Sequence, residues 1–378
     1  MKKLILILCI LLSYSLYAQE KAPNNTIAKQ LLEQVTRHLM NEEYKQLHQM
    51  LDERMAAMLT PEKMAKTFQS FSKQYGKIQK GLEFSEQVKA EQTFYRQGLQ
   101  LEKEKMNLLI TLNDEQKLSN FLLKPYTPIY SWSPPSYANL SSFTEENIKV
   151  GDSLALLGIY TQTKDASTSI VVFVHGSGPN DMDESLGPNK LFKDLAYGLA
   201  SQGINSIRYN KRSFDYPSQM GKMMNISIDD IVVNDAVIAI QTAKDKGAKK
   251  VILVGHSLGG HMSAKIADQI TVDGVIVLAG NVSPLEDLLV PQYEHILKND
   301  PETSINEFHL NMIKNQVKRV QDKDYDEKTA APMLPLSLPA SFWLSLKDYK
   351  PAKVSKKQAQ AYLILNGERD YQVTIEQA

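Results

Sequence analysis

Between residues 145 and 378 the sequence alternates strand-like runs with longer stretches of helical periodicity. The run at residues 170–174 is apolar throughout, which is typical of a strand covered by helices on both faces of a parallel sheet. Further strand patterns follow at residues 204–209, 251–254, 275–278 and 362–365. Strands that alternate with helices pack as a doubly wound sheet, so we predict an α/β fold with a mostly parallel sheet for residues 145–378.

This alternation stops between about residues 282 and 355, where patches of helical periodicity replace it. Insertions of this length between two strands are usually functional. We therefore interpret residues 282–355 as a helical lid over a site at the end of the sheet. A surface decoration without function is the alternative.

Residues 24–125 have a different composition, rich in Gln, Lys, Glu and Met and poor in Gly. Apolar residues recur at helical spacing from Ile27 to Leu39, and the alternation at residues 106–112 indicates a later strand. Helices followed by strands predict a small α+β domain of unknown function. Four prolines between residues 125 and 135 are incompatible with a regular element, so we predict a Pro-rich linker at residues 126–144.

The first residues have the pattern of an export signal. Two lysines follow Met1, an apolar segment comes next, and Ala18 offers a small residue for cleavage. We predict a signal peptide at residues 1–18 and a secreted or periplasmic protein, with a retained N-terminal anchor as the alternative. The single cysteine, Cys9, lies within this segment. Its removal would exclude disulfides and thiol catalysis from the mature chain.

The charges of the chain balance, because Lys plus Arg and Asp plus Glu both number 43. A chain without net charge has no long-range field that would attract nucleic acid or an anionic membrane. We therefore expect a small-molecule substrate, no nucleic-acid partner and, once the signal is removed, no integral membrane association. Whether the N-terminal domain binds a further, unknown partner is left open.

The segment GHSLG at residues 255–259 stands between a predicted strand and a predicted helix. This is the context of a nucleophile elbow, a sharp turn that pushes a serine hydroxyl out of the sheet. Its two glycines leave room for a strained backbone, and the helix N-terminus favours developing negative charge. We predict that Ser257 is a catalytic nucleophile, with a structural serine in a tight turn as the alternative.

The segment HGSGP at residues 175–179 directly follows the strand at residues 170–174. Glycines let a backbone approach a substrate closely, so we predict that the main-chain amides of Ser177 and Leu258 form an oxyanion hole. An ordinary Gly-Pro turn is the alternative. We interpret His175, at the end of the strand, as a structural residue rather than a catalytic base.

A carboxylate is expected after the strand at residues 362–365, where the segment NGERDYQV covers residues 366–373. At the carboxyl end of a strand it would hold a catalytic histidine in the productive tautomer and stabilise its charged form. We predict Asp370 for this role. Glu368 is the second choice, and a surface turn is the alternative.

Three basic residues, Arg208, Lys211 and Arg212, follow one another at the end of the strand at residues 204–209. They would either bind an anionic group of a substrate or pair with nearby acids, and we favour the pairing. The candidate acids are Asp181, Asp183 and Glu184. No His or Cys is placed to complete a metal site with these acids, so we expect neither a metal nor another cofactor.

With these segments in this order, the chain from about residue 145 to its end resembles the α/β-hydrolase superfamily, and within it bacterial esterases and serine aminopeptidase-like hydrolases. The segments that carry the resemblance are HGSGP, GHSLGG and GERDYQV. Residues 178–194 are similar to an exported bacterial branch with an N-terminal domain of unknown function. Residues 24–125 resemble the cystatin-like or nuclear-transport-factor-like group. The resemblance implies hydrolysis of esters or amides through an acyl-enzyme, without a cofactor.

In this superfamily the catalytic residues run serine, acid, histidine along the chain. Here all seven histidines precede Asp370, and the sequence ends at Ala378. Two hypotheses account for this: the sequence stops before the histidine loop, which we favour, or the protein is a non-catalytic, hydrolase-like binding protein. We expect the sequence as given to hydrolyse substrate poorly. Ester cleavage is our first hypothesis for the reaction, and amide or peptide cleavage is the second.

Overall fold

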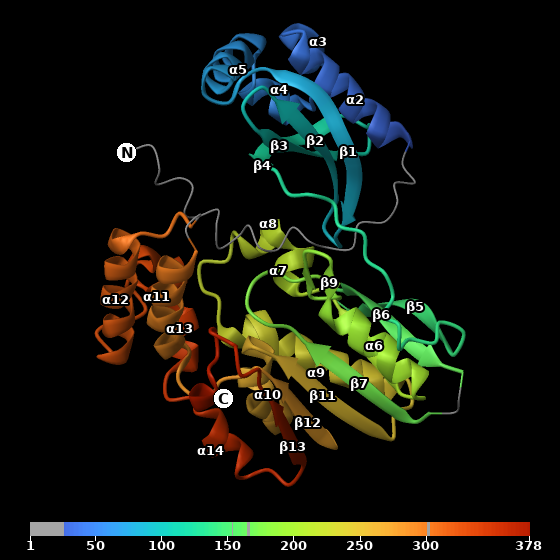
Figure 1. The fold of residues 1–378 in the computed structure, drawn as a ribbon, viewed down its shortest axis with the longest axis vertical. Coiled ribbons are helices and arrows are strands. Elements are labelled where there is room, and N and C mark those ends of the chain that lie inside the picture. Colours follow the sequence, from blue (N-terminus) through green and yellow to red (C-terminus); the bar gives the residue numbers. More distant parts are fainter. Residues whose placement is uncertain (1–25, 153, 165–166, 301–302) are drawn as a thin grey trace. The chain divides into compact units, whose positions relative to one another are not determined.

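The computed structural model describes residues 26–152, 154–164, 167–300 and 303–378. The chain divides into two compact units, and the boundary along the chain falls between Trp132 and Ser133 (Figure 1). The predicted signal peptide at residues 1–18 lies outside the described residues. Within the described ranges, no helix combines the length and the apolar character that a membrane span requires.

The N-terminal unit has helices first and an antiparallel sheet afterwards, which confirms the predicted α+β class. Its helices are α2 (Thr26–Met40), α3 (Tyr44–Gln49), α4 (Glu53–Met58) and α5 (Pro61–Tyr75). Its strands pair in the order β1 (Ile78–Val88), β2 (Thr93–Leu101), β3 (Lys105–Leu112) and β4 (Leu118–Pro125). Leu32 of α2 shares an apolar core with Leu99 and Leu108 of the sheet. The helices therefore cover one face of this sheet.

The second unit is built on a sheet with the strand order β13-β12-β11-β7-β10-β6-β5. Neighbouring strands are parallel from β13 to β10, whereas β6 and β5 are antiparallel at one edge. The strands are β5 (Phe143–Val150), β6 (Leu156–Thr163), β7 (Ser169–Val174), β10 (Asn205–Tyr209), β11 (Lys250–His256), β12 (Gly274–Leu278) and β13 (Ala361–Leu365). A short hairpin of β8 (Ser185–Leu186) and β9 (Asn189–Lys190) follows β7. This topology confirms the predicted α/β fold with a mostly parallel sheet.

Strand β7 shows why the sheet needs apolar residues on both faces. Val172 belongs to the same core as Met262 of α10 (Leu258–Gln269), whereas Phe173 packs with Phe192 of α6 (Leu191–Ser201). The rings of Phe173 and Phe192 stack with their centroids 4.9 Å apart. Alternate side chains of a strand project to opposite faces, so a continuous apolar run requires helices on both sides. Each fully buried side chain of this kind contributes about 1.5–3 kcal/mol.

The remaining helices before the insertion connect the strands of this sheet. They are α7 (Arg212–Asp215), α8 (Pro217–Met220) and α9 (Asn234–Asp245), with a π-helical turn at Asp229–Val233 in front of α9. Figure 1 shows α9 and α10 beside β7 and β11. The helical segment that ends in α9 therefore begins as a π-helix rather than an α-helix.

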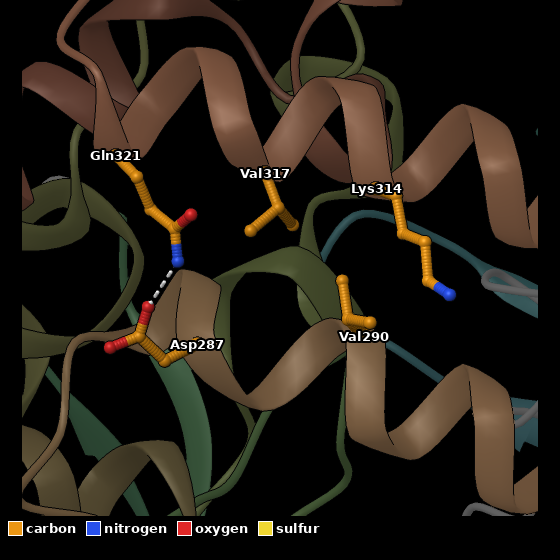
Figure 2. A pocket seen from close by; sticks show the side chains of 5 residues that line it. All are labelled: Asp287, Val290, Lys314, Val317 and Gln321. Carbon is orange, nitrogen blue, oxygen red and sulfur yellow. Dashed lines mark hydrogen bonds between the residues drawn. The ribbon is translucent and has the colours of Figure 1, made fainter.

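The inserted residues 282–355 fold as helices, as their periodicity predicts. The main ones are α11 (Leu289–Asn299), α12 (Glu307–Gln321), α13 (Ala340–Leu346) and α14 (Pro351–Ser355). Ile313 of α12 and Trp343 of α13 belong to the core of the sheet, so the insertion packs onto this unit. A groove of about 530 Å³ separates α11 from α12 (Figure 2), and its lining residues are Asp287, Val290, Lys314, Val317 and Gln321.

Candidate active site

Ser257 lies on the turn between β11 and α10 and has a strained backbone. Its φ is 51° and its ψ is −114°, a left-handed conformation that non-glycine residues rarely adopt. Such a residue costs about 1–3 kcal/mol and persists only where its neighbours hold it. The Ser257 N–H donates to the carbonyl of Leu278 at 2.8 Å, and the Ser257 carbonyl accepts the N–H of His261 at 2.9 Å. The serine predicted as nucleophile therefore has the geometry of an elbow.

Glycines around this turn are required by close contacts rather than by loop flexibility. A Cβ at Gly255 would lie 2.4 Å from the Gly259 carbonyl oxygen and 2.4 Å from Ser263 Oγ. A Cβ at Gly259 would lie 2.3 Å from the carbonyl oxygen of Val174. These distances are well inside van der Waals contact, so a side chain at either position would push α10 away from β7 and β11.

The loop after β7 approaches the elbow through Gly176. A Cβ at Gly176 would lie 3.1 Å from the Cβ of Ser257. The Gly176 N–H donates to Glu184 Oε1 at 2.6 Å, so this amide is engaged within the protein. In the part of the chain that the structure describes, the next amide, that of Ser177, donates to no protein group. The loop therefore offers the Ser177 amide rather than the Gly176 amide to a ligand.

His256, directly before the serine, faces acidic groups. Its Nδ1 lies 3.0 Å from Oε2 of Glu184. Burial alone would lower the pKa of His256, but the interaction with Glu184 and the charge of Asp370 outweigh it and raise that pKa. His256 is therefore part of a polar cluster next to Ser257.

Asp370 lies on the loop after β13, in the position that the sequence predicts. Its Oδ1 accepts the main-chain N–H groups of Gln372 at 2.8 Å and Val373 at 3.1 Å. This loop also contacts α11: Gln292 Nε2 donates to the Gln372 carbonyl at 2.9 Å. Glu368, the second choice for the acid, is exposed. Of the two carboxylates, Asp370 is the one whose charge acts on His256.

Two buried titratable groups, His175 and Lys211, lie behind the Gly176 loop. His175 is 2% exposed, and burial lowers its pKa to about 4, so the ring is neutral at ordinary pH. Lys211 is 3% exposed, and burial lowers its pKa to about 8. Its Nζ donates to the Gly176 carbonyl at 2.6 Å. His175 fits the structural role that the sequence predicts for it.

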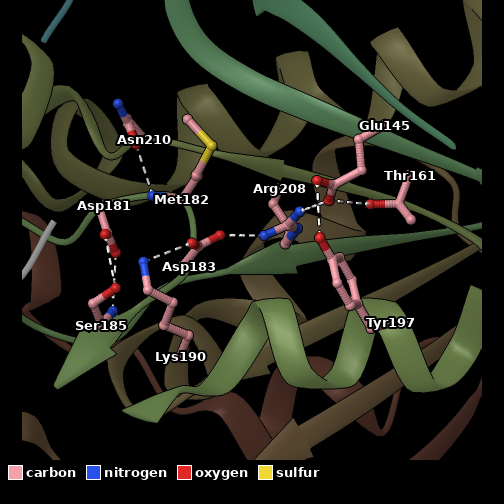
Figure 3. Close-up of polar contacts among 10 residues, drawn as sticks. All are labelled: Glu145, Thr161, Asp181, Met182, Asp183, Ser185, Lys190, Tyr197, Arg208 and Asn210. Carbon is pink, nitrogen blue, oxygen red and sulfur yellow. Dashed lines mark hydrogen bonds and ion pairs between the residues drawn. The ribbon is translucent and has the colours of Figure 1, made fainter. Parts of the chain in front are cut away.

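Arg208 is wholly buried and pairs with two carboxylates, those of Asp183 and Glu145 (Figure 3). Lys190 adds a second cation, with its Nζ 3.2 Å from Asp183. Burial alone raises the pKa of Asp183, but the charges of Arg208 and Lys190 outweigh it and hold that pKa below its ordinary value. Arg208 therefore serves the ion pairing that we favoured and not the binding of a substrate anion.

The other two basic residues have different partners from those expected. Arg212 pairs with Asp235, with a distance of 3.0 Å between Nε of Arg212 and Oδ2 of Asp235. Lys211 Nζ donates to the Gly176 carbonyl. The sequence did not predict the hydrogen bonds of Glu184 and Lys211 with the backbone of Gly176. No local pattern signals them, because the partners are 8 and 35 residues apart along the chain.

A mostly parallel sheet, helices on both faces and a strained serine on a strand-to-helix turn define an α/β-hydrolase. A family model described as "Serine aminopeptidase, S33" matches residues 165–374, and the chain belongs to this family. "Esterase EstD" of Thermotoga maritima is 31% identical over 339 residues, which cover 89% of this chain and 78% of the relative. The protein is therefore a hydrolase.

Other similarities concern the first unit and the fold. Residues 33–121 match a family model described as a protein of unknown function (DUF3887). An esterase of Pyrococcus furiosus shares 14% identity and has a TM-score of 0.43, covering 67% of this chain and 80% of its own. An acylaminoacyl peptidase of Pyrococcus horikoshii shares 13% identity and has a TM-score of 0.41, covering 80% of this chain and 48% of its own.

Proposed function

We propose that this protein is a serine esterase that cleaves small carboxylic esters through an acyl-enzyme. The observation that carries the proposal is the strained Ser257, with the backbone of Gly176 against its Cβ. Such an arrangement exposes a hydroxyl beside main-chain amides, which is what attack on a carbonyl requires. The similarity to an esterase over most of the chain supports esters as the substrate class.

In the proposed reaction, Ser257 Oγ attacks the carbonyl carbon of the ester and gives up its proton to a base. The negative charge that develops on the carbonyl oxygen is stabilised by the amides of Ser177 and Leu258. Collapse of this intermediate breaks the bond to the alcohol, which leaves with a proton, and the acyl group stays on Ser257. Water then attacks the acyl group in the same way and releases the acid.

We assign Asp370 as the acid that orients a histidine base. Within the described residues, its carboxylate accepts main-chain amides and is hydrogen-bonded to no histidine. We therefore propose that these residues hold no positioned base and that this chain turns over slowly.

Amide or peptide hydrolysis by the same residues is the second candidate, because the matching family model is described as a serine aminopeptidase. Both reactions proceed through the same acyl-enzyme and differ in the leaving group. A panel of p-nitrophenyl esters and aminoacyl anilides separates them. Higher kcat/KM on the anilides would overturn the ester assignment.

A fluorophosphonate probe tests the nucleophile, because it reacts covalently with activated serines. We expect slow labelling of this chain at Ser257, because the described residues place no base beside it, and no labelling of the Ser257→Ala variant. Ser263→Ala is the matched control, since Ser263 lies in α10, the helix that directly follows Ser257, and its Oγ donates to the Gly259 carbonyl. Equal labelling of the chain and of Ser257→Ala would exclude Ser257 as the nucleophile, and with it the proposed mechanism.

We also propose that the protein is exported, on the pattern of residues 1–18 alone. Expression of the full chain in a bacterium, followed by N-terminal sequencing of the secreted or periplasmic fraction, tests this. A mature N-terminus near Gln19 is the expected result. Recovery of the intact chain in the cytoplasm would contradict it.

A further inference from the structure

The peptide group between Gly176 and Ser177 is held firmly at its carbonyl oxygen. That oxygen accepts Lys211 Nζ at 2.6 Å and Asn180 Nδ2 at 3.2 Å. Asn180 Nδ2 also donates to the Ser177 carbonyl at 3.0 Å, and the Asn180 carbonyl accepts the Lys211 N–H at 3.0 Å. Lys211 and Asn180 therefore bind the loop and one another.

A peptide group is planar and trans, so its carbonyl oxygen and its N–H lie on opposite edges of one rigid plane. Fixing the Gly176 carbonyl on Lys211 therefore also fixes the direction of the Ser177 N–H. A hydrogen bond from an ammonium is stronger than one from a neutral donor. It polarises the peptide group, and a polarised group is a better donor at its other end.

The position of Lys211 makes this contact hard to replace. The residue follows β10 directly, precedes α7, and is 3% exposed. Four titratable groups surround it: His175, Tyr209 and Asp235 share a small cavity with Lys211, and the charge of Glu184 acts on it as well. Burial of a lysine costs free energy. The hydrogen bond from Lys211 to the Gly176 carbonyl of the active-site loop offsets part of this cost.

We propose that Lys211 is a positioning residue, which aims and polarises the Ser177 amide for the oxyanion through the Gly176 carbonyl. This inference rests on the proposed function, because it concerns the oxyanion hole of that reaction. This role differs from a purely structural one in one respect: the charge of Lys211 must polarise the Ser177 amide.

The sequence offers a direct way to observe this one peptide group. Ser177 is the only serine that follows a glycine. Cell-free synthesis with carbonyl-¹³C glycine and ¹⁵N serine therefore yields a single NMR signal in an experiment that correlates a carbonyl with the following amide. This signal belongs to Gly176–Ser177 and requires neither substrate nor turnover.

We expect this signal to shift as the pH is raised, with a midpoint near the Lys211 pKa of about 8. In Lys211→Met the signal should start at a different position and lose this midpoint. Any midpoint that comes from His256 should remain. Lys193→Met is the matched control, because Lys193 is also buried, at 8% exposed, but belongs to α6. Its signal should titrate like that of the unmodified chain.

A signal without a midpoint near pH 8 in the unmodified chain would overturn the role of Lys211, and this measurement needs no variant to fold.

Kinetics provide the second measurement. Loss of an oxyanion-hole donor lowers kcat about 10²–10³-fold, and misalignment of that donor should cost roughly tenfold or more. We expect Lys211→Met to lower kcat and the rate of fluorophosphonate labelling by this factor with KM nearly unchanged. Unchanged rates would overturn the role of Lys211.

The two proposals can fail separately. A signal that responds to Lys211 in a chain whose Ser257 is not labelled would overturn the proposed function and leave the contact between Lys211 and the loop intact. Labelling of Ser257 together with a signal indifferent to Lys211 would overturn this inference and leave the esterase proposal intact.

Discussion

The carboxylate of Glu184 lies 3.0 Å from Nδ1 of His256, and its other oxygen accepts the Gly176 N–H at 2.6 Å. One side chain thus joins the loop after β7 to the residue that precedes Ser257. Glu184 itself has a left-handed backbone, with φ 49°. A conformation of this kind in a non-glycine residue persists only where tertiary contacts hold it.

Replacing Glu184 by Gln should lower the pKa of His256. The pair with Glu184 raises this pKa against the effect of burial, so removal of the negative charge leaves burial to dominate. The stabilisation by the pair is fully present below the unfolded pKa of histidine and is lost as the pH rises through the raised folded pKa. NMR titration of the His256 ring measures the shift. Glu368→Gln, which removes an exposed carboxylate, is the control, and an equal pKa in both variants would contradict the pairing.

Gly259→Ala should destabilise the protein and reduce labelling of Ser257. The new Cβ would lie 2.3 Å from the Val174 carbonyl oxygen, and overpacking of this kind costs about 1–3 kcal/mol. Gly367→Ala is the control, because the nearest atom to its Cβ would be 3.9 Å away. Urea unfolding measures both. A Gly259→Ala variant as stable and as reactive as Gly367→Ala would refute the argument from close contacts.

His175 should make the fold sensitive to acid. Its pKa is about 4 in the folded protein, against about 6.5 for an unperturbed histidine. The folded state therefore binds fewer protons than the unfolded state between these values, and stability is lost as the pH falls from about 6.5 to about 4. The loss from this residue is about 3 kcal/mol. In His175→Asn, the difference between the unfolding free energies at about pH 7 and about pH 4 should shrink by that amount. An unchanged difference would show that His175 does not titrate as inferred.

Added imidazole should accelerate ester hydrolysis by this chain. In the described residues, Asp370 has no hydrogen bond to a histidine, and a general base contributes about 10²–10⁴-fold to such reactions. A free imidazole that enters the site should restore part of this factor, roughly tenfold. The acceleration should be absent in Ser257→Ala, after correction for hydrolysis by imidazole alone. Rapid turnover that does not respond to imidazole would show that one of the existing histidines already acts as the base.

Local patterns in the sequence were sufficient to predict the fold class and the elbow. The apolar run of β7 requires cover on both faces, so it implies a parallel sheet before any contact is known. The segment GHSLG stands between a strand and a helix, and this order requires a sharp turn at Ser257. These features depend on interactions between residues that are neighbours along the chain.

The surroundings of Ser257 were decided by the tertiary structure. Lys211 reaches the Gly176 carbonyl and Glu184 reaches His256 only because the carboxyl ends of parallel strands meet at one edge of the sheet. Arg208 likewise looked like a residue that could bind a substrate anion, until packing buried it between Asp183 and Glu145. The charge of a side chain can be read from the sequence, whereas its partner and its exposure follow from the packing of distant segments.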